Sequence, residues 1–404
     1  MIYTITASPC LDQVLRLDER VEKVEPGTMR VGRQEERPGG KGIDVSRAVQ
    51  ALGGSTTAIA PLDSTIGQQV KALVRMEGLD IVECGVANPT RTNYIVVTPN
   101  GDEYRINTKA PAFSAIELAA FFDLIFATVK RSSYVTIGGS TPVGFKPAWC
   151  QTIIRRLKSE GCMIALDTTA EVTKACLQRD DSRPNIIKPN LIEFHDFLMF
   201  LDLPGFEEGL LTNEDIAIAR DKGLSREDFL EWKYTNPNDN PALTKRWATL
   251  VHACAKFFDR YEGGVTPIIS LGRQGVLMAH NDNGSTEVLH SYHPEEVQVI
   301  ARVGAGDSLL GAFLTARENK RNVGEALQFA VAAATVRVSM TVEQELLSYI
   351  DLDLVTEKIS TNAIRQDIYQ EPFDLTEPLF LEQEAAKSSR RPRKSQTNQP
   401  ARPN

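Results

Sequence analysis

The chain has 404 residues, 42% of them hydrophobic, which is enough apolar material for one large α/β domain or for two domains. Its formal net charge of -8 gives no global attraction to nucleic acid or to an anionic membrane, so we expect neither as a partner. No apolar run is long enough to span a bilayer, and the first residues follow a strand pattern rather than that of a signal peptide. Six scattered cysteines, without a CxxC pair or zinc-site spacing, predict buried, reduced thiols in a cytoplasmic protein.

In chain order, the first elements are short stretches in which apolar and polar residues alternate. This pattern is typical of half-exposed strands in a small antiparallel sheet, and it also fits a surface hairpin. The stretches cover residues 14–17, 29–34, 92–98 and 103–106.

Elsewhere, short and almost continuous apolar runs alternate with longer helical patterns. Such runs are typical of parallel strands that are covered on both faces, and the alternation predicts βαβ units in a doubly wound three-layer core. The expected strands cover residues 134–137, 163–166, 185–188 and 267–271. The expected helices cover residues 42–52, 66–77, 115–129, 147–158, 308–316 and 324–338.

Two segments depart from this rhythm. Residues 203–243 are acidic at first and then rich in Asn and Pro, which predicts an inserted surface loop with one or two short helices. Residues 376–404 carry basic side chains among Ser, Gln and Pro, which predicts a disordered tail. Such a tail is either simply solvated or a binding segment for a polyanion.

The strongest chemical signal is a turn of three small residues, Gly304, Ala305 and Gly306, followed by Asp307. A turn that leads into a helix leaves several N–H groups without partners, and together with the helix dipole they form an anion site. A carboxylate beside them can accept a proton from a hydroxyl group while the N–H groups hold a phosphoryl group. The alternative is a Gly-rich turn in which Asp307 is an ordinary helix cap.

A second segment, residues 38–47, contains the run Gly39-Gly40-Lys41. The glycines allow a ligand to approach the backbone and Lys41 supplies a compact positive charge, although a turn leading into a helix would look similar. The run is not a Walker A loop, because no GK[ST] follows. Together, the two segments resemble the paired signatures of the PfkB (ribokinase-like) family of carbohydrate kinases. Residues 2–6, followed by Pro9 and Leu11-Asp12, look most like its hexose-phosphate kinase branch.

The resemblance extends from residue 1 to about residue 339 and implies a fold. We expect a ribokinase-like three-layer α/β/α core with a mainly parallel central sheet and a small antiparallel β lid. The kinase domain would cover residues 1–375, with lid strands within about 10–36 and 90–108. In this family the lid covers the sugar site and often joins subunits, which implies a homodimer.

The resemblance also implies which residues contact the substrate. Asp12 would accept hydrogen bonds from vicinal sugar hydroxyls, although a turn cap is the alternative. The Arg91 guanidinium would bind the phosphate that the substrate already carries, although a solvated strand charge is possible. The remaining substrate contacts implied are Gly39, Gly40, Lys41, Asp44, Asn93 and Ser140.

ATP and Mg²⁺ are the implied cosubstrate and metal. The spacing Asn190-x-x-Glu193 predicts a capping box at a helix start, and the resemblance adds that both side chains hold water around Mg²⁺. Residues 270–275 have the pattern of a hairpin turn and resemble the nucleotide loop of the family, with residues 324–338 as the other wall of the adenine pocket. The implied nucleotide contacts are Lys188, Asn190, Ser270, Gly272 and Gly275.

In the implied mechanism, Asp307 accepts the proton of a primary hydroxyl as its oxygen attacks the γ-phosphorus of ATP. Fructose 1-phosphate, giving fructose 1,6-bisphosphate, is the default substrate. The alternatives are a tagatose-6-phosphate or other sugar kinase, and a regulatory protein that binds sugar phosphates with weak catalysis or none.

Four positions depart from the family pattern: Ser8, Asp44, Arg105 and Arg302. An acid at position 44 replaces an amide that commonly meets sugar hydroxyls, so we expect it to alter sugar recognition or to pair with Arg105 or Lys41.

Overall fold

The computed structural model describes residues 1–18, 28–99, 103–201, 210, 240–295, 297–300, 303–340 and 349–365. The predicted insertion at 203–243 lies almost entirely outside the described residues, and the predicted tail at 376–404 lies entirely outside them.

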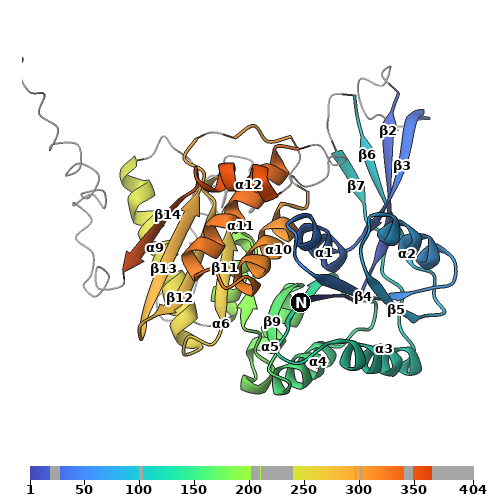
Figure 1. The fold of residues 1–404 in the computed structure, drawn as a ribbon, viewed down its shortest axis with the longest axis horizontal. Helices are drawn as coiled ribbons and strands as arrows, with labels where there is room; N and C mark the ends of the chain where they lie inside the picture. The colour runs from blue at the N-terminus through green and yellow to red at the C-terminus, as the bar shows by residue number, and fades with distance from the viewer. Residues whose placement is uncertain are drawn as a thin grey trace, which may run out of the picture.

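Within the described residues, a ten-stranded sheet runs in the order β14-β13-β12-β11-β10-β9-β8-β1-β4-β5 (Figure 1). All pairings from β5 to β11 are parallel, and those of β11 through β14 are antiparallel. The mainly parallel sheet predicted from the sequence is therefore confirmed. Its strands are β1 Ile2–Thr6, β4 Thr56–Leu62, β5 Ile81–Gly85, β8 Tyr134–Gly139, β9 Met163–Thr168, β10 Ile186–Ile187, β11 Thr266–Ser270, β12 Val276–Asp282, β13 Ser285–Tyr292 and β14 Ser360–Arg365.

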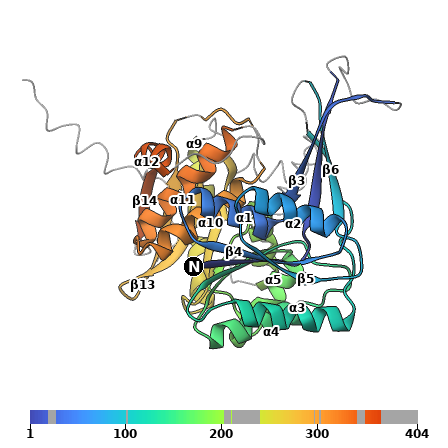
Figure 2. The same ribbon diagram turned by 45° about the vertical axis from the view of Figure 1, so that its right-hand side comes forward.

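Helices cover both faces of this sheet, because successive residues of its strands point to opposite sides. Ile268 packs into a core with α1, α10 and α11, whereas its neighbour Ile269 packs into a core with α3, α4, α5, α6 and α9. Figure 2 shows α3 and α4 on one side of the sheet and α1, α2 and α10 on the other. This explains why the strands read as continuous apolar runs rather than as alternating ones. The helices are α1 Lys41–Ala51, α2 Ile66–Met76, α3 Ala115–Thr128, α4 Pro147–Ser159, α5 Ala170–Leu177, α6 Leu191–Leu201, α9 Asn240–Arg260, α10 Ala305–Glu318, α11 Val323–Val338 and α12 Tyr349–Thr356.

A second, four-stranded sheet has the order β3-β2-β6-β7 and confirms the predicted lid. Two antiparallel pairs, β2–β3 and β6–β7, are joined by a parallel pairing of β2 with β6. Figure 2 shows β3 and β6 projecting away from the central sheet. Its strands are β2 Cys10–Leu17, β3 Val31–Gly39, β6 Arg91–Val97 and β7 Glu103–Ile106.

No helix in the described part of the chain combines the length and the apolar character that a bilayer span requires. All six cysteines are buried free thiols, as the sequence predicts.

Candidate active site

The anion turn, residues 303–306, lies at the start of α10. Gly304 is the N-cap residue with a left-handed φ of 78°, a conformation that glycine adopts without strain, and α10 begins at Ala305. The helix therefore starts earlier than the predicted residue 308, because the small residues themselves form its first turn. No side chain caps this end, so the reading of Asp307 as an ordinary cap is wrong. Its first N–H groups have no partner within the helix, as at any uncapped N-terminus.

The Asp307 side chain lies at this turn and is half-buried. Its Oδ1 atom is buried and has no hydrogen-bond partner among the described residues. Burial raises the pKa of Asp307 to about 7, and the negative charges of Asp44 and Asp167 add to the rise, while Lys41 and Lys188 oppose it. A carboxyl group with a pKa near neutrality suits a general base, because it can both lose and accept a proton under working conditions.

A second charged group lies at the carboxyl ends of β9 and β10. Asp167 accepts from Nζ of Lys41 at 2.7 Å, and Nζ of Lys188 lies 3.2 Å from its other carboxylate oxygen. Lys188 also approaches the anion turn, since a Cβ atom on Gly306 would lie only 2.9 Å from its Nζ. The structure therefore brings Lys41 and Lys188, predicted as contacts of different ligands, onto one carboxylate beside Asp307.

Sequence reasoning missed Asp167. The signal was its position directly after a predicted buried strand, since polar residues at the carboxyl ends of parallel strands line the crevice of such sheets. Nothing in the local sequence indicated its partners, because Lys41 is 126 residues away along the chain.

The residues predicted for the sugar subsite lie where the lid meets the core. Asp12 lies within β2 rather than in a turn, paired in register with Asn93 of β6. Nδ2 of Asn93 donates to Oδ1 of Asp12 at 2.9 Å, and Sγ of Cys10 lies 3.2 Å from the same oxygen. Gly39 faces the other carboxylate oxygen, and a Cβ atom on it would lie 2.5 Å from Oδ2. The missing side chain at Gly39 therefore keeps space beside the Asp12 carboxylate.

Arg91 is half-buried at the start of β6 rather than a solvated strand charge. Nη1 donates to the carbonyl of Thr108 at 3.3 Å and Nη2 to the carbonyl of Ser8 at 3.1 Å, while Nε is buried and finds no hydrogen-bond partner in the described ranges. Ser140 follows β8 and is also half-buried, directly after Gly139, which packs near Lys41.

The predicted partners of Asp44 are wrong. Asp44 pairs with Arg47 one turn later in α1 at 2.5 Å, whereas Lys41 pairs with Asp167 and Arg105 with Glu103. Local spacing decides this, because residues three apart share one face of a helix. Arg47 is in turn fixed by Glu77 at 2.9 Å and by the carbonyl of Pro38 at 3.0 Å. Burial raises the pKa of Asp44, and Arg47 opposes that rise.

Two other departures from the family pattern have different outcomes. The hydroxyl of Ser8 is buried without a hydrogen-bond partner. Arg302 lies outside the described residues.

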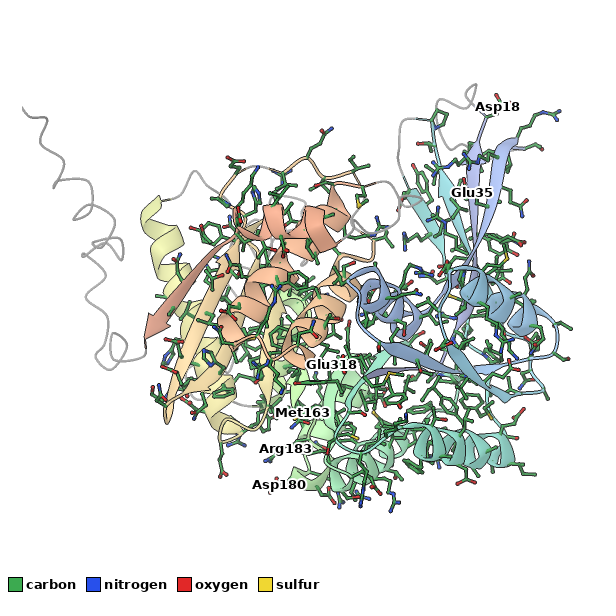
Figure 3. The ribbon with its side chains drawn as sticks, viewed as in Figure 1. Asp18, Glu35, Met163, Asp180, Arg183 and Glu318 are labelled. Atoms are coloured by element: carbon green, nitrogen blue, oxygen red, sulfur yellow. The ribbon has the colours of Figure 1, made fainter. Side chains whose placement is uncertain are left out.

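Several ion pairs of the lid involve Glu35, labelled in Figure 3. Its carboxylate lies 2.9 Å from Arg33 and 3.1 Å from Arg37.

The predicted capping box at Asn190 is confirmed. Oδ1 of Asn190 accepts from the N–H of Glu193 at 2.9 Å, and Oε2 of Glu193 accepts from the N–H of Asn190 at the same distance. The described residues contain no cluster of three or more His, Cys, Asp or Glu side chains that could surround a metal ion. The Glu193 charge does act on Lys41, whose pKa is raised by Asp167, Asp307 and Glu193 against the effect of burial.

The predicted hairpin turn at residues 270–275 is also confirmed. It joins the antiparallel strands β11 and β12, and the N–H of Leu271 donates to the carbonyl of Gly275 at 2.9 Å. The N–H of Ser270 donates to the carbonyl of Pro189 at 3.1 Å, which holds this loop beside Lys188 and Asn190. These predicted nucleotide contacts therefore adjoin one another, next to the group formed by Asp167 and the two lysines.

Comparison with known proteins places this arrangement in a family. The family described as "pfkB family carbohydrate kinase" matches residues 6–213 and 242–346. Over 335 residues the chain is 24% identical to "ATP-dependent 6-phosphofructokinase isozyme 2" of Escherichia coli (strain K12), covering 83% of this chain and 91% of that protein. The identity to "1-phosphofructokinase" of Bacillus subtilis (strain 168) is also 24%, with the same coverage. It is 25% to "Tagatose-6-phosphate kinase" of Staphylococcus epidermidis, over 82% of this chain and 90% of that protein.

Solved structures show the same fold. The Escherichia coli phosphofructokinase-2 in complex with substrates and products superposes with a TM-score of 0.68 at 23% identity, over 88% of this chain and 98% of that one. A possible 1-phosphofructokinase from Thermotoga maritima gives a TM-score of 0.66 at 18% identity, over 90% of this chain and 100% of that one. With the family match spanning most of its length, the chain belongs to the pfkB family of carbohydrate kinases.

Proposed function

We propose that this protein transfers the γ-phosphoryl group of ATP to the primary hydroxyl of a hexose phosphate, with fructose 1-phosphate as the first candidate. The observation that carries the proposal is Asp307, whose buried Oδ1 atom at the uncapped start of α10 has no hydrogen-bond partner in the part of the chain that the structure describes. A buried polar atom without a partner is costly in a folded protein and is commonly retained for function.

The chemistry divides between the carboxylate and the turn. Asp307 accepts the hydroxyl proton, and positioned general-base catalysis of this kind contributes roughly a hundred- to ten-thousandfold in rate. The free N–H groups at the start of α10 bind the phosphoryl oxygens as charge develops, and losing one such donor costs about 3–4 kcal/mol of barrier. A water-poor site strengthens both effects, because charges interact more strongly where the dielectric is low.

The sugar phosphate lies under the lid. Asp12 accepts hydrogen bonds from its hydroxyls, and Asn93 donates hydrogen bonds to them. Gly39, Gly40 and Asp44 lie close to the ring. Arg91 and Ser140 hold the phosphate that the substrate already carries, and the buried Nε of Arg91 is a donor still available to it.

ATP lies along Lys188, Asn190, Ser270, Gly272 and Gly275. When Mg²⁺ is bound, it neutralises charge on the nucleotide phosphates. Because the caps occupy one oxygen of Asn190 and one of Glu193, these residues suit contacts to the water shell of the ion better than direct ligation.

We also infer a homodimer formed through the lid. The lid strand β7 carries the exposed apolar side chains of Tyr104 and Ile106, which an isolated subunit leaves in water. Escherichia coli phosphofructokinase-2 has a tetrameric inhibited form, so members of this fold do associate.

Release of ADP across a substrate panel tests the function. The panel contains fructose 1-phosphate, fructose 6-phosphate, tagatose 6-phosphate, fructose and ribose, each with ATP and Mg²⁺. We expect turnover on a hexose phosphate and little on the unphosphorylated sugars. Binding of sugar phosphates without ADP release from any of them would contradict the kinase and favour a regulatory protein.

A further inference from the structure

Asp167 occupies the centre of three strand ends. Its strand β9 pairs with β8 through Gly138 and with β10 through the residue before it, so its side chain leaves the sheet between two neighbours. The side chain is only 3% exposed. An ionised carboxylate at such a position is strongly unfavourable unless charged partners compensate it.

Two ammonium groups supply that compensation from different parts of the chain. Lys41 reaches Asp167 from the first residue of α1, and Lys188 reaches it from the end of the adjacent strand β10. Burial alone would raise the pKa of Asp167, yet Lys188 and Lys41 outweigh it and hold the pKa below its usual value. Asp167 is therefore ionised, with Oδ1 hydrogen-bonded to Lys41 and Oδ2 ion-paired with Lys188 but without a hydrogen-bond partner among the described residues.

The three charges sum to one excess positive charge beside the anion turn. Nζ of Lys188 lies next to Gly306, and the Lys41 ammonium interacts with the carboxylates of Asp307 and Glu193. Without Asp167, two flexible ammonium groups of like charge would repel each other across the same space. One carboxylate can therefore fix both of them at the place where a phosphoryl group would pass.

We propose that Asp167 is a positioning residue that holds the Lys41 and Lys188 ammonium groups against the anion turn, so that both face the phosphoryl group in transit. This inference rests on the proposed kinase function. It gives the two lysines one shared task instead of separate substrate and nucleotide contacts, and it assigns a role to a buried acid that the sequence did not single out.

A double-mutant cycle tests the coupling. Asp167→Asn keeps the size of the side chain and removes its charge, and we expect kcat to fall about a hundredfold, comparable to the loss of one oxyanion-hole donor in other enzymes. In a Lys41→Met Lys188→Met background the same substitution should cost less than threefold, because its partners are gone. Asp181→Asn, an exposed acid paired with Arg155, is the matched control and should leave kcat unchanged. Equal losses in both backgrounds would overturn the inference.

The pH profile adds a readout that a merely structural role would not move. The charged groups that act on Asp307 are Asp44, Asp167, Lys41 and Lys188. A base must be ionised, so kcat/KM falls as pH drops below the pKa of Asp307. Removing the negative charge of Asp167 should move this acid limb to lower pH, and Lys41→Met should move it to higher pH. Shifts of the same sign in both variants would contradict the proposed arrangement.

Chemical labelling separates this inference from the function itself. Asp167 raises the pKa of Lys41, so Asp167→Asn should increase the neutral fraction of this amine and speed its acetylation by acetic anhydride. Lys146, which is exposed, serves as the internal reference in mass spectrometry. If Lys41 is acetylated at the same rate relative to Lys146 in both proteins, the contact between Asp167 and Lys41 is overturned, whatever the activity. Faster relative acetylation of Lys41 in the variant, combined with no turnover by the wild-type protein, would confirm the contact and overturn the kinase function.

Discussion

At the scale of single residues, the site depends on groups whose surroundings change their chemistry. Asp167 is a buried acid and Asp307 and Asp44 are half-buried ones, yet lysines hold the pKa of Asp167 low while the pKa of the other two is raised. The sequence alone predicted Asp307 as a base, but it could not show which of the three carboxyl groups has a raised pKa and which has a lowered one. Their difference comes from partners that only the folded chain supplies.

Gly39→Ala tests the sugar subsite at this scale. The new Cβ would lie 2.5 Å from Oδ2 of Asp12, so the carboxylate must shift away from the sugar hydroxyls. We expect KM for the sugar phosphate to rise at least tenfold, equivalent to about 1.4 kcal/mol, with KM for ATP unchanged. Steady-state kinetics with each substrate varied in turn measure both constants.

Gly85→Ala is the control, because a Cβ on Gly85 at the end of β5 meets nothing within 4 Å. If the two variants behave alike, Asp12 does not contact the sugar.

At the scale of elements, the sequence predicted what periodicity determines. Continuous apolar runs located β8, β9 and β11, and alternation located the lid strands, because burial on two faces or on one leaves those patterns. The predicted strand 185–188 shrinks to Ile186–Ile187, since pairing partners and not composition set its ends. The predicted hairpin turn at residues 270–275 implied the antiparallel strand β12, but β13 and β14 were not predicted, because no pattern in the sequence marks them.

Two capping boxes provide a matched test of one element. Asn190 and Asn322 cap α6 and α11 with the same geometry, but only Asn190 adjoins Lys188 and the nucleotide loop. Each Asn→Ala change should cost about 1 kcal/mol of unfolding free energy, measured by urea denaturation. Only Asn190→Ala should also raise KM for MgATP.

If Asn322→Ala raises KM for MgATP equally, the increase results from the loss of stability in both variants. The Asn190 side chain then has no role at the nucleotide.

At the scale of the whole molecule, the parallel strands of the central sheet end on one side, where the Lys41, Asp167 and Lys188 side chains meet, and the lid contacts the core there through Arg91 and the carbonyl of Ser8. The order of strands explains why residues as distant as Lys41, Asp167 and Asp307 meet, and no local reading of the sequence could have given that meeting. The sequence did predict the two glycine-rich segments, residues 38–47 and 303–306. Their chemistry depends on backbone N–H groups more than on particular side chains.

The inferred dimer is a property of this scale. Ile106→Asp places a charge on the exposed apolar patch of β7, and burying that charge in an interface without a partner would oppose association. We expect a dimer for the wild-type protein and a monomer for the variant in light scattering coupled to size-exclusion chromatography.

Ile116→Asp serves as control, because this side chain is more exposed but lies at the start of α3, outside the lid. A dimer that persists in Ile106→Asp would exclude β7 from the interface.

The turnover of Asp307→Asn tests the central claim most directly. The raised pKa means that the folded protein binds more protons than the unfolded chain at acidic pH, so ionisation above pH 7 costs stability. The neutral amide removes that cost, and we expect a melting temperature at pH 8 at or above that of the wild-type protein. In this intact fold, kcat should drop by roughly a hundred- to ten-thousandfold while titration calorimetry shows unchanged ATP binding. A kcat close to that of the wild-type protein would contradict the assignment of Asp307 as the base.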